Sequence, residues 1–166
     1  MTDWQQPFTV LLTQSQGASV LHETVYENRL GYTDTLVQMG ADISSFRQCL
    51  GGKLCRFHNT GCNHSIVVKG ATPLIGKPIT IPDLRAGFAY VMAALIAEGE
   101  STITGTEFLD RGHENLTNKL QKLGADISKI PLPKQRAKKD PDLFLYEFSQ
   151  DLEDESELSA LHRLDI

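Results

Sequence analysis

Apolar residues recur at helical spacing in two stretches, and each stretch is followed by residues that favour a strand. The second stretch runs over residues 83–97 and begins at Asp83, while the first begins at Asp3 and ends before Gly17. These features predict two helices with aspartate N-caps and, for the first, a C-terminal glycine. One face of the first helix carries three apolar side chains at positions i, i+4 and i+7, namely Trp4, Phe8 and Leu11.

The chain contains one supersecondary unit twice. The string MGADIS at residues 39–44 nearly matches LGADIS at residues 123–128. The pattern predicts an α/β fold of repeated βαβαββ units, with copies at about residues 1–82 and 83–130 and with the first strand of the first copy missing. We therefore expect exposed strand edges and a tendency to self-associate. The remaining strands are expected at residues 19–22, 41–45, 66–68, 79–81, 101–104 and 125–129.

Residues 131–166 differ from the repeats in composition. Prolines at 131 and 133 break the pattern, and the apolar residues within 143–148 suit one docking strand or helix. Residues 140–166 hold nine acids and one base, a net charge of −8, which leaves +3 for residues 1–139 of this chain of net charge −5. We predict a domain over residues 1–130 and a charged, partly mobile tail over residues 131–166.

The charge distribution and the cysteines narrow the function classes. A mildly basic body suits a small anionic ligand better than a nucleic acid, and the longest apolar run is too short for a membrane span. The start of the chain has no signal-peptide pattern, and three cysteines form an odd number. These observations predict a cytoplasmic protein without disulfides, with neither a nucleic acid nor a membrane as partner.

Three arginines stand out as candidate anion-binding residues. Arg29 and Arg111 are expected near helix starts at equivalent repeat positions, and Arg85 lies just inside the helix that begins at Asp83. A cation at a helix N-terminus opposes the helix dipole by roughly 0.3–1 kcal/mol, so surface pairing with a nearby acid explains a single such arginine. Two at equivalent positions favour an anion site. For Asp3 and Asp83, plain N-capping is the simpler interpretation.

Residues 49–64 contain five side chains that can bind metals. Their spacing fits no common zinc pattern, in which paired ligands are two to four residues apart. Incidental thiols in an exposed insertion are therefore the preferred interpretation, and no metal or cofactor is expected. The five residues are Cys49, Cys55, His58, Cys62 and His64.

Several motifs resemble the C-terminal part of the UDP-N-acetylglucosamine 1-carboxyvinyltransferases, a family of enolpyruvyl transferases. The resemblance covers about residues 2–130 and implies a partial inverse α/β barrel, which agrees with the repeat. The motifs are Asp3, ETVYENR at 23–29, MGA at 39–41, DLRA at 83–86, AEG at 97–99, DRG at 110–112 and LGA at 123–125.

The resemblance implies transfer of the enolpyruvyl group of phosphoenolpyruvate to the 3-hydroxyl of UDP-N-acetylglucosamine, the first committed step of peptidoglycan synthesis. Asp3 matches the aspartate that contacts this hydroxyl and acts as its base. Val25 matches a residue that binds the sugar nucleotide, and Tyr26 lies beside it. Arg85 and Arg111 match arginines that hold phosphoenolpyruvate or gate closure over it.

Two departures from the family limit this expectation. The catalytic loop with its general-acid cysteine has no counterpart in the chain, and residues 87–90 read GFAY where the family has small polar residues. We therefore expect a fragment that is inactive alone, with the missing N-terminal half or self-association as a partner. The alternatives are a non-catalytic sugar-nucleotide-binding or interaction remnant and, more weakly, an enzyme similar to 3-phosphoshikimate 1-carboxyvinyltransferase.

Overall fold

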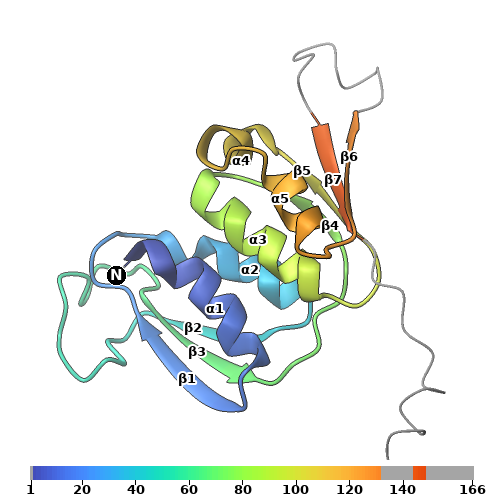
Figure 1. Cartoon of the computed structure of the whole chain (residues 1–166). Coiled ribbons are helices and arrows are strands. Elements are labelled where there is room, and N and C mark those ends of the chain that lie inside the picture. Colours follow the sequence, from blue (N-terminus) through green and yellow to red (C-terminus); the bar gives the residue numbers. More distant parts are fainter. Residues whose placement is uncertain (1, 132–143, 149–166) are drawn as a thin grey trace, which may run out of the picture.

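The computed structural model describes residues 2–131 and 144–148. The first copy of the repeat begins with a short 3-10 helix, η1, that leads into a ten-residue helix (Figure 1). A second 3-10 helix and a short α-helix lie between its first two strands. Its elements are η1 (Thr2–Trp4), α1 (Gln5–Gln14), β1 (Gly17–His22), η2 (Arg29–Gly31), α2 (Tyr32–Gln38), β2 (Asp42–Phe46) and β3 (Ser65–Gly70).

The second copy repeats this order and adds a leading strand. Its first helix, at 13 residues, is the longest in the described part of the chain. The elements are β4 (Pro78–Thr80), α3 (Leu84–Ile96), β5 (Ser101–Thr104), α4 (Glu107–Gly112), α5 (Leu116–Lys122), β6 (Ile127–Pro131) and β7 (Phe144–Phe148).

The two sheets share one topology. The first sheet has the order β1-β3-β2, and the second has the order β4-β5-β7-β6, with the last strand of each copy antiparallel to both of its neighbours. This equivalence confirms the predicted βαβαββ unit. It also extends the second copy beyond residue 130, because β7 occupies the position that β3 occupies in the first sheet. Of the two forms expected for residues 143–148, the strand is the observed one.

The remaining residues expected in a mobile tail, 132–143 and 149–166, lie outside the described residues. The first sheet has an exposed strand edge of the kind that the missing first strand predicts. β1 has a free edge within the described residues, whereas its counterpart β5 is covered by the parallel strand β4. Whether this edge causes self-association stays a prediction.

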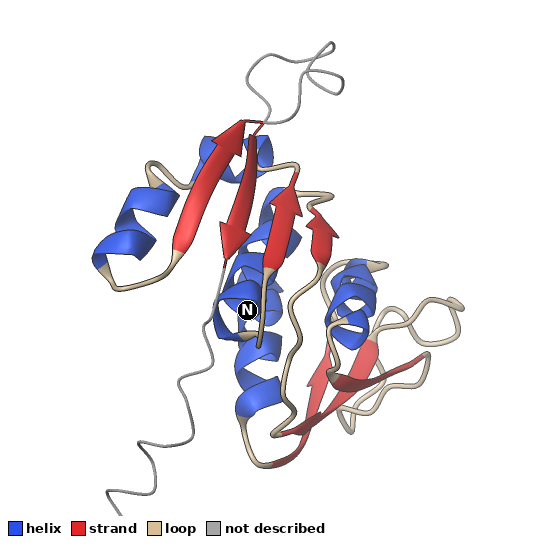
Figure 2. Cartoon of the chain, turned by 90° about the vertical axis from the view of Figure 1, so that its right-hand side faces the viewer, coloured by secondary structure: helices blue, strands red, loops and turns tan. Residues whose placement is uncertain are grey.

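Helices α1, α2 and α3 lie side by side between the two sheets (Figures 1 and 2). A single apolar core joins the helices to the inner faces of both sheets. None of the described helices is long and apolar enough to cross a membrane. Fully buried core side chains include Leu36, Met39, Ile66, Val68, Ile103, Tyr146 and Phe148.

The apolar face of the first helix is not the face that the fold buries. Trp4, Phe8 and Leu11 are 65%, 45% and 55% exposed, and the opposite face of α1 is buried. That face carries Thr9 and Thr13, whose hydroxyls donate to the carbonyl oxygens of Gln5 and Val10 at 2.8 and 2.7 Å. Small side chains with satisfied hydroxyls let a helix pack closely against α3 and β3, and apolar spacing alone cannot reveal this choice.

The two aspartates expected to cap helices behave differently. Asp83 caps α3, because one of its carboxylate oxygens accepts hydrogen bonds from the backbone N–H groups of Arg85 and Ala86. Asp3 lies inside η1, and α1 has Trp4 at its N-cap position without a side-chain cap. The predicted cap at Asp3 is therefore wrong, and its carboxylate is available for other contacts.

Replacement of Phe148 with alanine tests whether β7 belongs to the folded unit. Phe148 is 2% exposed and pairs with both Ser101 and Ile127. Loss of this buried ring should lower the free energy of unfolding by about 3–5 kcal/mol in urea denaturation. The control Leu123→Ala removes a side chain that is 83% exposed and should change stability by less than about 0.5 kcal/mol. Equal small effects would contradict the placement of β7 in the core.

Candidate functional site

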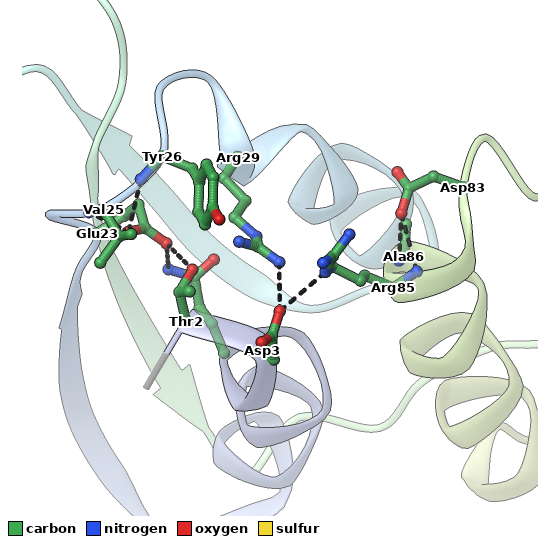
Figure 3. A network of polar contacts seen from close by, with 10 residues as sticks. Thr2, Asp3, Glu23, Val25, Tyr26, Arg29, Asp83, Arg85 and Ala86 are labelled. Atoms are coloured by element: carbon green, nitrogen blue, oxygen red, sulfur yellow. Dashed lines mark hydrogen bonds and ion pairs between the residues drawn. The ribbon is translucent and has the colours of Figure 1, made fainter. Parts of the chain in front are cut away.

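One carboxylate joins the two repeats at their N-terminal helices. Asp3 Oδ1 accepts hydrogen bonds from Arg85 Nε at 2.9 Å and from Arg29 Nη2 at 3.0 Å (Figure 3). Arg29 comes from η2 of the first repeat, and Arg85 comes from the first turn of α3 in the second. The packing of α1 against α3 brings Asp3 and Arg85 together, although they are 82 residues apart in sequence, and Arg29 joins them.

The two arginines stabilise the ionised form of Asp3. Hydrogen bonds from Arg85, and then from Arg29, lower the pKa of Asp3 below its ordinary value of 3.8. The same contact raises the pKa of Arg85. Within the described part of the chain, both ion pairs use Oδ1 of Asp3. The other carboxylate oxygen, Oδ2, is therefore left as an acceptor for a ligand. The aspartate side chain is 68% exposed and is therefore accessible to a ligand.

A buried glutamate orders the loop beside this cluster. Glu23 is 3% exposed, and its carboxylate accepts four hydrogen bonds within the described residues. Oε2 accepts from Thr2 Oγ1 and Gln5 Nε2, and Oε1 accepts from the backbone N–H groups of Val25 and Tyr26 at 2.6 and 3.1 Å. Glu23 thus connects η1 and α1 to the turn that follows β1 (Figure 3).

Burial alone would raise the pKa of Glu23. Hydrogen bonds from Thr2, Val25 and Tyr26 outweigh that effect, so the pKa lies below its ordinary value of 4.5. The ionised carboxylate is therefore the form that the loop requires. Glu23 begins the ETVYENR motif, but the sequence alone indicated no role for it, because burial of a carboxylate after a strand has no sequence signature.

The turn after β1 brings Tyr26 onto Arg29. The Arg29 guanidinium lies 4.7 Å from the centre of the Tyr26 ring, a cation–π geometry. Asn28, between them, has a φ of 54°, a left-handed conformation that asparagine tolerates better than most residues. The Arg29 side chain is only 10% exposed, so the stacked ring and Asp3 hold it in one orientation.

A cleft of about 600 Å³ opens between the two repeats beside this cluster. Its volume is in the range of small-molecule sites. Aromatic rings and charged groups of both signs line it, which suits a ligand with a ring and an anionic group. These lining residues include Tyr26, Arg29, Tyr32, Asp83, Arg85 and Tyr90.

The structure gathers some of the expected site residues and separates others. Tyr26 and Arg85 line the cleft, and Asp3 is bonded to Arg85. Val25 is 46% exposed and lines a neighbouring hollow with Trp4 and other residues. Arg111 is exposed, does not line the cleft, and lies over the Phe108 ring at 5.8 Å.

The predicted equivalence of Arg29 and Arg111 is wrong. Arg29 begins η2, whereas Arg111 is in the last turn of α4. A cation near a helix C-terminus is favoured by the helix dipole, so Arg111 carries none of the expected electrostatic penalty. The helix equivalent to α2 is α5, which begins after Arg111. Short motifs shared by the repeats do not reveal that α4 takes the place, in the second repeat, of the turn and η2 of the first.

The comparisons with known proteins agree on one family of enzymes. The family model described as EPSP synthase (3-phosphoshikimate 1-carboxyvinyltransferase) matches residues 1–128. The chain is 68% identical over 130 residues to a UDP-N-acetylglucosamine 1-carboxyvinyltransferase of Protochlamydia amoebophila, which covers 78% of the chain and 28% of that protein. It is 60% identical over 128 residues to the protein of the same name from Chlamydia pneumoniae, with 76% and 28% covered.

A solved structure shows the same fold. The enolpyruvyl transferase NikO from Streptomyces tendae matches with a TM-score of 0.60 and 27% identity, over 76% of this chain and 26% of that one. The chain thus spans less than a third of the length of these relatives. The family model ends its match at residue 128, so β7 extends the repeat beyond the residues that this model matches.

Replacement of Glu23 with glutamine should destabilise the turn that carries Tyr26. The amide nitrogen of glutamine cannot accept, so donors that now bond to one carboxylate oxygen lose their partner. We expect the free energy of unfolding to fall by about 1–3 kcal/mol in urea denaturation. Glu27→Gln, at an exposed position of the same turn, removes the same charge and should have little effect. Equal stabilities would contradict the anchoring role of Glu23.

The lowered pKa of Glu23 makes the stability difference between wild type and Glu23→Gln depend on pH. In the unfolded chain Glu23 binds its proton near pH 4.5, whereas the folded chain binds it only at lower pH. Its contribution to stability is therefore complete above pH 4.5 and is lost as the pH falls through the folded pKa. The stability difference between wild type and Glu23→Gln should shrink below pH 4.5. A constant difference from neutral pH down to below the folded pKa would contradict the shift.

Proposed function

Because the chain belongs to the EPSP synthase family of enolpyruvyl transferases, we propose that it carries part of a site that transfers an enolpyruvyl group to UDP-N-acetylglucosamine. The donor is phosphoenolpyruvate, and the acceptor is the 3-hydroxyl of the sugar. The observation that supports the proposal best is the Asp3 carboxylate, which is bonded to two arginines at the mouth of a cleft between the repeats.

In this proposal Asp3 acts as the base for the sugar hydroxyl. Phosphoenolpyruvate gains a proton at its methylene carbon, and the hydroxyl oxygen forms a bond to the neighbouring carbon. The hydroxyl proton passes to Asp3, which gives a tetrahedral intermediate with a methyl group. In the elimination that follows, the methyl group loses a proton, the electrons of that C–H bond form the new C=C bond, and phosphate leaves with the electrons of its C–O bond. Oδ2 of Asp3 is the oxygen that would accept the hydroxyl proton, since both arginines bond to Oδ1.

The arginines link anion binding to the strength of this base. While Arg85 and Arg29 both donate to Asp3, its pKa is low and the carboxylate is a weak base. A phosphate group in the cleft offers Arg85 a partner of higher charge. Transfer of Arg85 from Asp3 to that phosphate raises the pKa of Asp3, which makes proton abstraction more favourable once the donor substrate is bound.

Val25, Tyr26 and Arg111 are the remaining residues expected in the site, and they lie at different places around the cleft. Tyr26 presents an aromatic ring at the cleft, where it can stack on a ring of the sugar nucleotide. Val25 lies next to it, on the turn held by Glu23. Gly112 lies against Leu84, so Arg111 is close to the start of α3 and can approach the phosphate when the site closes. We propose binding roles for Val25, Tyr26 and Arg111 on this basis.

We further propose that the chain is inactive alone and acts with the remaining part of such an enzyme, which would supply the general acid. The exposed apolar face of α1, formed by Trp4, Phe8 and Leu11, is a surface that such a partner can cover. This reaction would belong to the cytoplasm of a bacterium, to peptidoglycan synthesis and cell wall biogenesis, and so to the control of cell shape and division.

Phosphate release from phosphoenolpyruvate and UDP-N-acetylglucosamine tests the activity. The chain alone should release none, and addition of the remaining part of a relative should start turnover. Turnover by the chain alone would contradict the claim of inactivity. UDP-N-acetylglucosamine can also be titrated while the backbone amide signals of Tyr26 and Arg111 are followed. Binding seen in these signals, without turnover after complementation, would instead favour a non-catalytic remnant. Preference for 3-phosphoshikimate in competition would favour the sister reaction.

Replacement of Asp3 with asparagine tests the proposed base in the complemented mixture. Loss of the proton acceptor should lower kcat by about 10²–10⁴-fold. The control Asp42→Asn removes a carboxylate that pairs only loosely with Lys69, at 3.9 Å, and should leave kcat unchanged. Full activity of the Asp3 variant would exclude this residue as the base.

A further inference from the structure

Four side chains that can bind a metal converge at one end of the first sheet. His22 is the last residue of β1, His64 lies directly before β3, and Cys49 and Cys55 come from the loop that joins β2 to β3. One ligand atom from each residue lies within 4.8 Å of all the others. Two cysteines and two histidines are a donor set that zinc favours.

Two of the six distances between the four ligand atoms match those around a tetrahedral ion. Cys49 Sγ lies 3.6 Å from Cys55 Sγ and 3.3 Å from His64 Nε2. Zinc binds sulfur at about 2.3 Å and nitrogen at about 2.0–2.1 Å, so a tetrahedron places its ligands roughly 3.3–3.8 Å apart. The two sulfurs are also too far apart for a disulfide bond, and all three cysteines are free.

The two histidines present nitrogen atoms that suit coordination. His64 is 1% exposed, and its Nδ1 lies 3.0 Å from the carbonyl oxygen of Cys62. A proton on Nδ1 donates to that oxygen and leaves the Nε2 lone pair directed toward Cys49 Sγ, the arrangement that second-shell carbonyls impose on metal-bound histidines. His22 Nε2 is buried and has no hydrogen-bond partner among the described residues. Coordination would satisfy this buried nitrogen.

One of the two sulfurs is oriented by a backbone contact. The backbone N–H of Phe57 donates to Cys55 Sγ at 3.4 Å, the kind of outer-shell hydrogen bond that positions a metal ligand. Phe57 is 4% exposed and packs its ring beside His64, at 6.1 Å between ring centres. Gly51 lies against the other side of the group, where an added Cβ atom would collide with His22 Nδ1. The backbone is thus closely fitted around the four side chains.

The loop over residues 47–64 gives the site a structural purpose. It contains turns and no helix or strand, and few of its side chains are buried. Long loops of this kind need another source of order. A metal bound by Cys49 and Cys55 from the loop and by His22 and His64 from the strand ends would join the loop to the sheet.

We propose that His22, Cys49, Cys55 and His64 bind one zinc ion in a closed, structural Cys2His2 site. Protein atoms occupy all four positions, which leaves no open position for a substrate or water. His22 directly precedes Glu23, so a bound metal would hold the end of β1. The turn that Glu23 anchors begins there and leads to Tyr26 at the cleft. The proposal is independent of the enolpyruvyl transfer reaction.

The ligand set differs from the five candidates within residues 49–64. His58 Nδ1 lies 4.0 Å from Cys49 Sγ, but His58 is exposed and outside the group of four. Cys62 Sγ contacts Thr60 Oγ1 at 3.0 Å and also lies outside the group. His22 is on β1, outside residues 49–64, so the spacing within that stretch cannot reveal this set of four ligands.

Metal content of the reduced full chain tests the proposal. Chain purified in zinc-containing medium should carry one zinc per molecule by mass spectrometry of the metal. X-ray absorption should show two sulfur ligands at about 2.3 Å and two nitrogen ligands at about 2.0–2.1 Å. Replacement of zinc with Co²⁺ should produce thiolate-to-cobalt charge-transfer absorption. Chelation should lower the Tm without any change to the sequence.

Variants identify the ligands. Cys49→Ser, Cys55→Ser and His22→Asn should each lose the bound metal, and the matched control Cys62→Ser should keep it. His58→Asn should also keep it. Failure of the reduced wild-type chain to bind Zn²⁺ or Co²⁺ would overturn the proposal, as would metal that stays bound in all three ligand variants. Both wild-type measurements stand even if a variant does not fold, and none of these readouts involves transferase activity.

Discussion

The packing of α1 against α3 determines where the charged groups of the site lie. α1 and α3 are the first α-helices of the two repeats, and the contact between them places their N-terminal ends side by side. Thr9 and Thr13 on α1 and Ala89 and Ala93 on α3 are all buried at or below 1% exposure, so small side chains allow the helices to approach closely. Asp3 and Arg85 then meet although they are 82 residues apart in sequence.

The ion pairs at this junction arrange the charged groups more than they stabilise the fold. Asp3 is largely exposed, and exposed ion pairs contribute little to stability. One carboxylate holds two guanidinium groups beside the cleft that both arginines line. Glu23 has the opposite character, because its carboxylate is buried and accepts four hydrogen bonds, so its network belongs to the fold.

The turn that leads to the cleft and the cysteine loop meet at the same end of β1. The turn after β1 leads to Tyr26 and Arg29 at the cleft. The loop between β2 and β3 approaches His22 at the end of the same strand. His22 and Glu23 are adjacent in sequence yet face different groups: the first meets His64 and the cysteine loop, and the second meets Thr2 and Gln5. Order at the cysteine loop is thereby connected to order at the cleft through one strand end.

The sequence alone determined the features that depend on neighbouring residues. The repeat of MGADIS and LGADIS predicted the βαβαββ unit, and Asp83 predicted the start of α3, since capping involves residues two and three positions away. The strand predicted at residues 66–68 followed from a β-branched run between turns, and it is observed as Ser65–Gly70. The motifs around Asp3, Arg85 and Arg111 were sufficient to identify the family.

Only the tertiary structure decided the features that depend on packing between distant segments. It placed Trp4, Phe8 and Leu11 outside, gave Asp3 two arginine partners in place of a capping role, and separated Arg111 from Arg29. It also brought His22 to Cys49 and Cys55. Helical periodicity identifies the faces of a helix, but neighbouring elements determine which face is buried. The partners of a charged or metal-binding side chain are likewise determined by the chain segments that the fold places beside it.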